Sequence, residues 1–333
     1  MKKLSIFLIL LCAIGAAQGQ ISQSDEATRL SADVVKLFSE KKYKEALPIA
    51  EKVVRLREQE FGANNFKTGE ALRNLGFIQE ANGDKKEAEK TLEKAIANYE
   101  AKNDLTKDFQ VQLAQMLEIV AFFKYKNRKT EKAIEFYQKA SELREKVHGQ
   151  DALETVNSLW SLANIYQIQK NYKSAEKMYR RVLEIRAKKL ERSDSEVQDA
   201  KIRYQCVAVR NDNSEEAKNF IKLLETTNSS DDNQNRSNSN FTMIRGGVVN
   251  GKATNLVRPA YPIEARSARA SGAVNVQVTI NEEGKVIFAC AMSGNKLLFD
   301  ASENAAYQST FDPITILGKA VKVTGVIVYN FVP

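Results

Sequence analysis

The 333-residue sequence contains little histidine and little proline, and each scarcity excludes a class of protein. The one histidine, His148, excludes metal sites built from several histidines, and a histidine-based catalytic triad has no evident partners. The five prolines are too few for a long proline-rich rod, and none lies between residues 226 and 240. We therefore expect no enzyme activity and no cofactor.

Cysteine is also scarce, with three residues in the chain. Cys206 and Cys290 make no disulfide framework, and a chain of this length does not need a disulfide to hold its core. We expect both to be separate, buried, small apolar side chains, with a bridge between them as the alternative. Cys12 follows Leu11, where a lipoprotein signal needs a small residue, so we do not expect lipidation.

Long apolar runs are confined to the N-terminus. Residues 4–14 are apolar except for Ser5, follow two lysines and precede the small residues of segment 15–19. This order is typical of a secretory signal peptide, and the run is well short of the roughly 20 residues of a membrane span. We predict a signal peptide over residues 1–19 and a periplasmic or cell-envelope location. The alternative is an uncleaved anchor in the inner membrane.

The most prominent feature that the sequence does contain is an internal repeat. Five alanines recur at separations of 42, 45, 42 and 42 residues: Ala46, Ala88, Ala133, Ala175 and Ala217. Sixteen residues before each of the first four stands a leucine, and the apolar residues in each unit recur at helical spacing. Small residues such as Gly76 and Ala88 would let two antiparallel helices approach closely. A fixed period of this length predicts a solenoid of helical hairpins.

The fourth unit carries the clearest motif, with Leu159–Tyr166 in its first helix and Tyr172–Tyr179 in its second. It resembles the tetratricopeptide repeat, in the longer form of kinesin-light-chain-like arrays. The resemblance covers residues 24–225 and implies an all-α array of about five helical hairpins. The fifth unit departs from it, with Lys201 and Gln205 where a leucine and a small residue are expected, and we interpret this unit as the cap.

In that family the first helix of each hairpin lines a concave groove. Asn164 matches the asparagine that such arrays turn towards the backbone of a bound peptide. The residues that the resemblance places in the groove are Arg73, Phe77, Phe122, Tyr125, Trp160, Asn164 and Gln167. The alternative is that Phe122 and Trp160 only pack between neighbouring repeats.

The composition changes after the repeats. Residues 226–240 contain no apolar side chain and predict a disordered polar linker. From Ala273 to Ile280 valines alternate with polar residues, which indicates a strand, and a turn leads to a second strand over residues 285–292. A helix over residues 297–311 and a third strand over residues 322–332 complete the pattern.

Residues 241–333 carry an ordered set of motifs that includes Pro259–Pro262, Gly272, Gly284 and Val326–Phe331. The set resembles the C-terminal domain of TonB. This resemblance implies a small α+β domain with a three-stranded antiparallel sheet and one packed helix. It also implies that the domain captures a short peptide from an outer-membrane receptor by strand addition.

The same resemblance implies which strand accepts the peptide. The last strand, Lys322–Tyr329, would be the edge of the sheet, and its contact residues would be Val323, Val326, Val328 and Tyr329. The alternative is that the chain's own segment Gly246–Tyr261, or a second copy of the chain, shields this edge.

Two features point weakly to other ligands. The segment Gly246–Ala253 nearly matches a phosphate-binding loop, but it has alanine where a magnesium-binding Ser or Thr is needed, and Pro259 follows instead of a helix. The net charge of +8 arises from lysines interleaved with glutamates, and export separates the chain from nucleic acid. We expect neither a small-molecule substrate nor a nucleic-acid partner.

The sequence therefore predicts an exported, non-enzymatic adaptor whose partners are proteins or peptides of the cell envelope, with an outer-membrane receptor as one candidate. The main alternative is a TonB-type energy transducer that couples the inner-membrane proton-motive force to outer-membrane transport, although the proline-rich rod of such proteins is missing. A third hypothesis is an envelope scaffold in which the C-terminal domain only self-associates.

Overall fold

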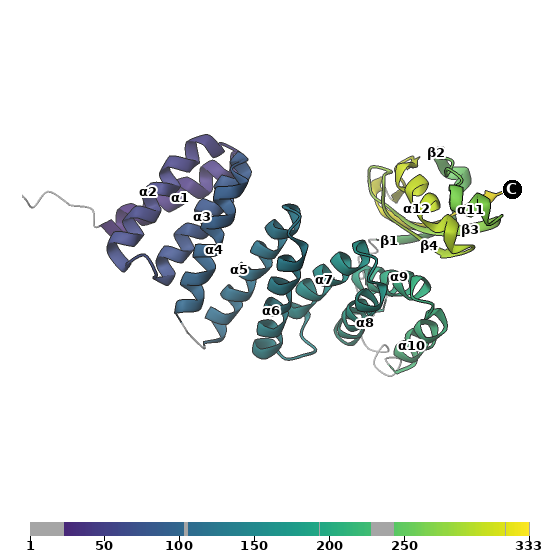
Figure 1. Cartoon of the computed structure of the whole chain (residues 1–333), viewed down its shortest axis with the longest axis horizontal. Helices are drawn as coiled ribbons and strands as arrows, with labels where there is room; N and C mark the ends of the chain where they lie inside the picture. Colours follow the sequence, from purple (N-terminus) through teal and green to yellow (C-terminus); the bar gives the residue numbers. More distant parts are fainter. Residues whose placement is uncertain (1–22, 103–105, 193, 228–242, 317, 333) are drawn as a thin grey trace, which may run out of the picture. The chain divides into compact units, whose positions relative to one another are not determined.

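The computed structural model describes residues 23–102, 106–192, 194–227, 243–316 and 318–332. The predicted signal peptide and the predicted linker residues 228–240 lie outside these ranges. In the described part, ten α-helices are followed by a domain with a β-sheet (Figure 1). The predicted fold class, an all-α repeat solenoid followed by a small α+β domain, is confirmed. The chain divides into two compact units, unit 1 with residues 1–147 and unit 2 with residues 148–333.

Unit 1 contains the first three hairpins. Their helices are α1 (Gln23–Ser39), α2 (Tyr43–Phe61), α3 (Phe66–Asn82), α4 (Lys85–Ala101), α5 (Lys107–Lys126) and α6 (Thr130–His148). The repeated alanines Ala46, Ala88 and Ala133 lie in the second helix of each hairpin and are at most 1% exposed. In α3, a Cβ added to Gly76 would lie 2.6 Å from Cγ of Leu92 on α4. The small residues of the repeat thus allow the close helix approach that the sequence predicts.

Charged side chains also join the helices of unit 1. Lys124 of α5 is 1% exposed and binds both Glu89 and Glu93 of α4. Burial alone would lower the pKa of Lys124, but the hydrogen bonds and charges of the two glutamates raise it overall. Arg144 of α6 donates hydrogen bonds of 2.9 and 2.8 Å to Glu118 of α5. Removing one partner of such a pair would leave a buried charge without its counter-ion, so these contacts fix how the helices pair.

Unit 2 begins with the last two hairpins. Their helices are α7 (Val156–Ile168), α8 (Tyr172–Lys189), α9 (Ser195–Arg210) and α10 (Ser214–Thr227). The repeated alanines Ala175 and Ala217 are again almost fully buried, and Leu159, Tyr179 and Val207 belong to the hydrophobic core of these helices. The five repeats of the sequence therefore correspond to five hairpins.

The C-terminal domain follows in unit 2. Its main strands are β1 (Met243–Val248), β3 (Gly272–Ile280), β4 (Val286–Ser293) and β8 (Lys322–Phe331), in the order β1-β8-β3-β4. The short strands β2 (Ala253–Asn255) and β5 (Thr310–Phe311) pair with each other, as do β6 (Thr315–Ile316) and β7 (Lys319–Ala320). Two helices, α11 (Ile263–Ser267) and α12 (Phe299–Gln308), complete the domain. Strands β8, β3 and β4 form the predicted antiparallel sheet, and β1 adds a fourth strand parallel to β8.

One face of this sheet packs against α12. Val274, Val276 and Val278 of β3 are fully buried and belong to one hydrophobic cluster with Phe299 and Ala306 of α12. Because side chains alternate along a strand, every second residue of β3 enters this core. The opposite face of the sheet is left for other elements to cover.

Candidate functional site

Two of the predicted groove residues, Asn164 and Gln167, lie one turn apart on α7 and share a partner. The phenol of Tyr179 on α8 donates to Oδ1 of Asn164 at 2.6 Å or to Oε1 of Gln167 at 2.9 Å. Tyr179 is fully buried, and burial raises its pKa to about 12. Nη1 of Arg203 on α9 lies 3.5 Å from the same oxygen of Asn164. Because the phenol stays protonated at neutral pH, its one proton is available to the oxygen of either amide, one at a time.

Trp160, the third predicted groove residue on α7, packs between helices. Its ring meets that of Tyr179 edge-on, with 5.3 Å between the centroids. The guanidinium groups of Arg186 on α8 and Arg203 on α9 lie 4.7 and 5.3 Å from its ring centroid. Such cation–π contacts place Trp160 between neighbouring repeats, which is the alternative raised for it above.

The other four predicted groove residues lie in unit 1. Phe122 on α5 is 50% exposed, and Nζ of Lys126 lies 5.7 Å from its ring centroid. The remaining three are partly buried: Arg73, Phe77 and Tyr125. Phe122 is thus the predicted groove side chain that is most open to a partner.

The structure corrects the prediction that β8 is a free edge. Strand β8 lies between β3 and β1, and β1 pairs with it in parallel from Met243 opposite Lys322 to Val248 opposite Val326. The alternative, in which the chain's own segment from Gly246 onward shields this edge, matches the structure, although β1 begins three residues earlier. An open edge presents unpaired N–H and C=O groups to any other strand, so a covered edge is protected against unwanted pairing.

The four predicted contact residues of β8 point to opposite faces. Val323 and Tyr329 are 1% and 5% exposed and share the core face with Ile327. Val326 and Val328 lie on the other face and are partly buried. A strand that pairs with β8 would therefore meet mainly its backbone, with two of the four predicted side chains on each face of the sheet.

The residues that follow β1 continue its pairing by other means. The N–H of Val249 donates to the carbonyl of Val326 at 2.9 Å. The amide of Asn250 donates from Nδ2 to the carbonyl of Val328 and accepts at Oδ1 from the N–H of Val328, both at 2.8 Å. A side-chain amide thus replaces a peptide group at the end of this ladder. We call the backbone of β8 from Lys322 to Val328, on the side that faces β1, the acceptor edge.

A disulfide joins the last repeat to the C-terminal domain. Cys206 of α9 and Cys290 of β4 are bonded, although they lie 84 residues apart in the sequence. The expectation of two separate cysteines is therefore wrong. The two cysteines belong to different domains in the sequence, but the fold brings these domains into contact through α9 and β4.

A second apolar stripe on α9 explains this contact. Tyr204 and Val207 face the helical core, whereas Cys206 packs with Phe288 and Cys290 of β4 in a separate cluster that Ile202 also contacts. Ile202, Cys206 and Val209 recur at helical spacing, and this pattern was the signal that sequence reasoning missed. Helix α9 therefore covers part of the sheet face that α12 leaves open.

Ion pairs reinforce the contact within unit 2. Arg210, at the end of α9, binds Asp300 at 2.9 Å and Glu303 at 2.6 Å, both on α12. Lys170 binds Asp300 at 2.9 Å, and this hydrogen bond is the main cause that holds the pKa of Asp300 below its ordinary value. Glu303 also accepts the backbone N–H of Ala291 on β4 at 2.8 Å, so a side chain occupies part of the outer edge of β4.

A cavity of about 400 Å³ lies where these elements of unit 2 meet. Its walls include Asn164 and Gln167 of α7, together with Arg203, Phe288 and Tyr307. The guanidinium of Arg203 lies 4.2 Å from the ring centroid of Phe288. The α7 part of the predicted groove therefore shares its space with β4 and α12.

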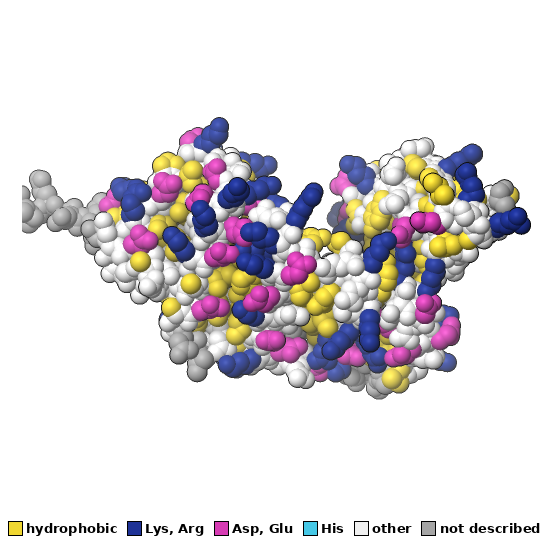
Figure 2. All heavy atoms as spheres, in the orientation of Figure 1, with side chains coloured by type: hydrophobic (Ala, Val, Ile, Leu, Met, Phe, Trp, Pro, Cys, Tyr) yellow, Lys and Arg dark blue, Asp and Glu magenta, His cyan; other side chains and the backbone are white. Residues whose placement is uncertain are grey.

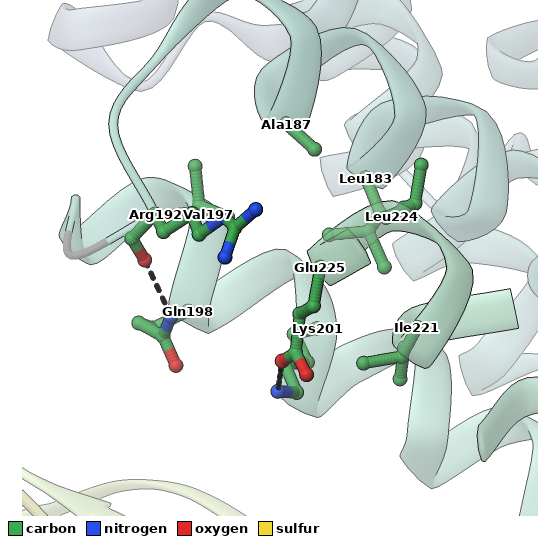
Figure 3. Close-up of a pocket in the computed structure, with 9 residues that line it drawn as sticks. All are labelled: Leu183, Ala187, Arg192, Val197, Gln198, Lys201, Ile221, Leu224 and Glu225. Atoms are coloured by element: carbon green, nitrogen blue, oxygen red, sulfur yellow. Dashed lines mark hydrogen bonds and ion pairs between the residues drawn. The ribbon is translucent and has the colours of Figure 1, made fainter. Parts of the chain in front are cut away.

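A second cavity, of about 290 Å³, lies among α8, α9 and α10 (Figure 3). Leu183, Val197 and Ile221 give it apolar walls. Lys201 and Glu225 form an ion pair at its side, which Figure 3 marks with a dashed line. The residues that line it are not among those predicted for the groove.

Comparison with known proteins identifies both regions. Residues 35–101 and 112–188 match the family model of the tetratricopeptide repeat, and residues 257–333 match that of the Gram-negative bacterial TonB protein C-terminal domain. The chain joins tetratricopeptide repeats to a TonB-type C-terminal domain. Both predicted resemblances are confirmed. No curated protein matches the sequence.

Two solved structures are similar to the chain at low sequence identity. The chain is 16% identical to the apo form of RapI, with a TM-score of 0.50, over 65% of this chain and 57% of that one. It is 17% identical to the kinesin-light-chain TPR-like repeats of Podosopora anserina, with a TM-score of 0.49, over 60% of this chain and 95% of that one. At such identities the similarity to RapI shows the fold alone.

The surface of the protein carries mixed charge. Figure 2 shows basic and acidic side chains interspersed on the visible face. Within the described ranges, no helix combines the length and the apolar character that a membrane crossing requires. In the same ranges, no three side chains of histidine, cysteine, aspartate or glutamate converge as metal ligands would.

Proposed function

We propose that the protein is an exported, non-catalytic adaptor of the Gram-negative cell envelope. Its tetratricopeptide repeats bind one protein partner, and its TonB-type domain captures an extended peptide by adding it to β8. The observation that carries this proposal is the acceptor edge, which in the structure holds a parallel strand through its backbone. Strand addition needs such an edge, because main-chain hydrogen bonds supply most of the affinity.

The repeats contribute two groups of side chains. Phe122 offers an exposed aromatic ring in unit 1. In unit 2 the Tyr179 phenol donates to the amide oxygen of Asn164 or to that of Gln167, and Nε2 of Gln167 lies 3.8 Å from Sγ of Cys206. The NH₂ group of Asn164 is therefore our candidate donor to a peptide carbonyl. Taken separately, α7 in unit 2 offers a contact for a peptide backbone, and α5 in unit 1 offers one for an apolar side chain.

The domain limits of the proposal are those read from the sequence: a signal peptide over residues 1–19, repeats over residues 24–225, a linker over residues 226–240 and the TonB-type domain over residues 241–333. The match to a TonB domain supports an envelope location and makes an outer-membrane receptor the candidate source of the peptide. The same match favours a second candidate, an energy transducer, which would require residues 1–19 to remain as an anchor.

The N-terminal residue of the protein separates these two candidates. We would fractionate the native host and determine that residue by mass spectrometry. A start near Gln18 or Gln20 in the periplasmic fraction supports the adaptor, because the anchor is then absent. An intact Met1 in the inner-membrane fraction refutes it and favours the transducer.

Site-specific cross-linking tests the binding surfaces themselves. A photo-reactive amino acid would replace Val328 or Phe122 in the native host, with exposed Lys94 on α4 as the control position. Each test position should yield its own cross-linked envelope partner, and the Val328 adduct should map to one short segment of that partner. Identical products at all three positions would refute selective binding.

A further inference from the structure

We infer that β1 is a removable placeholder on the acceptor edge, and that its replacement is a parallel peptide strand with a small residue three positions before an aliphatic one. The inference rests on the proposed capture of a peptide by β8. It adds what occupies the site before capture and which peptides fit.

The pairing of β1 with β8 is short and irregular. Strand β3 pairs with β8 along its whole length, from Gly272 to Ile280, whereas the described residues of β1 pair with it at four positions. The register shifts between Arg245 and Val248, where Gly247 has a φ of +62°. A bulge of this kind interrupts the ladder, so β1 can leave without disturbing the three antiparallel strands.

From Gly246 to Val248, the residues of β1 whose side chains the structure describes add little to its attachment. Gly246 and Gly247 have none, and Val248 is 63% exposed. The anchor is Val249, which is fully buried over Gly325 of β8: a Cβ added to Gly325 would lie 2.4 Å from Cγ1 of Val249. One aliphatic side chain and the Asn250 amide therefore hold this end of the segment.

The same contacts define the peptide that could replace β1. A Cβ added to Gly246 would lie 3.1 Å from Cγ1 of Val323 and 3.3 Å from Cγ1 of Val249, so a side chain here crowds both valines and the position favours a small residue. The space over Gly325 accepts an aliphatic side chain, because Val249 fills it. At Val328 a peptide would supply through its own backbone the two hydrogen bonds that Asn250 now makes.

An external strand can bind only to molecules in which β1 has left the edge. Its apparent affinity is therefore the intrinsic affinity multiplied by the fraction of such molecules. Asn250→Ala removes two hydrogen bonds to Val328 and should raise that fraction by about tenfold. Asn304→Ala is the matched control, because Asn304 is exposed on α12 and lies away from the acceptor edge. Far-UV circular dichroism would check that both variants keep their fold.

The probe is a fluorescent synthetic peptide with the sequence of residues 243–251, titrated into the full chain and followed by fluorescence anisotropy. The Asn250→Ala protein should bind it about tenfold more tightly than the wild type, whereas Asn304→Ala should not differ. Peptides with valine at the position of Gly246, or aspartate at that of Val249, should bind at least about tenfold more weakly. Equal binding of all three peptides would overturn the inferred sequence preference.

Hydrogen exchange of the full chain tests the placeholder role of β1 separately from the proposed capture of a peptide by β8. The amides of Val248 and Val249 should exchange much faster than those of Val276 and Val278 in β3, and faster still in Asn250→Ala. If they exchange as slowly as β3, then β1 is a permanent strand and the inference fails, although capture elsewhere could stand. If they exchange rapidly but no peptide binds, β1 does leave, and the proposed capture by β8 is what fails.

Discussion

Reduction of the Cys206–Cys290 disulfide should destabilise unit 2 without unfolding it. The bond closes a loop with a sequence separation of 84 residues. In the chain-entropy model, a loop of that length stabilises the folded state by about 4.5 kcal/mol at 25 °C, because the cross-link restricts the unfolded chain. The packing of Ile202 against the cluster that contains Phe288, and the ion pairs of Arg210 with Asp300 and Glu303, do not depend on the disulfide.

The tryptophan content of the chain makes this measurement specific. Trp160 is the one tryptophan in the sequence, and it lies on α7 in unit 2. Urea titrations followed by its fluorescence, with and without a reducing agent, therefore report on unit 2. The free energy of unfolding should fall by about 2–5 kcal/mol in the reduced protein, the lower end allowing for strain or residual structure. The double variant Cys206→Ser with Cys290→Ser should match the reduced protein and should not respond to reductant.

Two results would refute this reasoning. One is a thiol titration of the unreduced, urea-unfolded protein that finds Cys206 and Cys290 free. The other is a urea midpoint that is the same with and without reductant in a protein whose disulfide has been verified by mass spectrometry. In that second case the packing of α9 on β4 would hold unit 2 by itself.

Three further changes probe other parts of the structure. Gly325→Ala should displace Val249 and lower stability by about 1–3 kcal/mol in urea titrations, with faster amide exchange in β1; unchanged exchange would contradict it. Lys124→Ala should destabilise unit 1 by about 3–5 kcal/mol and Lys124→Met by less, measured by circular dichroism. Burial alone would raise the pKa of Glu89, but its lysine partners lower this pKa overall. The stability that the Glu89 carboxylate contributes is therefore present above the ordinary glutamate pKa, and it is lost as the pH falls through the pKa of the folded state. Acid should therefore destabilise the wild type more than Lys124→Met. Tyr179→Phe should lower stability by about 1–2 kcal/mol, and the absorbance of tyrosinate should show that this phenol ionises only near its raised pKa of about 12.

The two edges of the sheet are protected in different ways. On one side the chain supplies β1, and on the other Glu303 binds the backbone of β4 while α9 covers its face. The acceptor edge is covered by the irregular strand β1, whereas β4 is tied down by a disulfide and by ion pairs. This contrast is why the proposed capture is assigned to β8.

Much of the fold could be predicted because its signals are local. The alanines of the repeat, such as Ala88 and Ala175, mark the buried face of each second helix, since a helix returns to the same face every few residues. The alternation from Val274 to Ile280 likewise marks the core face of β3. These patterns depend only on neighbours along the chain, so the sequence by itself determined the solenoid, the three antiparallel strands and the residues in their cores.

Only the tertiary structure decided which residues far apart in the sequence come into contact. Strand β1 contains two glycines, so its sequence has no side-chain pattern that predicts a strand. Its backbone nevertheless pairs with β8, about 80 residues later in the chain. The disulfide depends on α9 lying against β4, and the hydrogen bonds of Asn164 depend on where Tyr179 and Arg203 are brought by their helices. Backbone pairing and domain contacts leave little trace in local periodicity, because the groups that satisfy each other are distant in the chain and are brought together only when it folds.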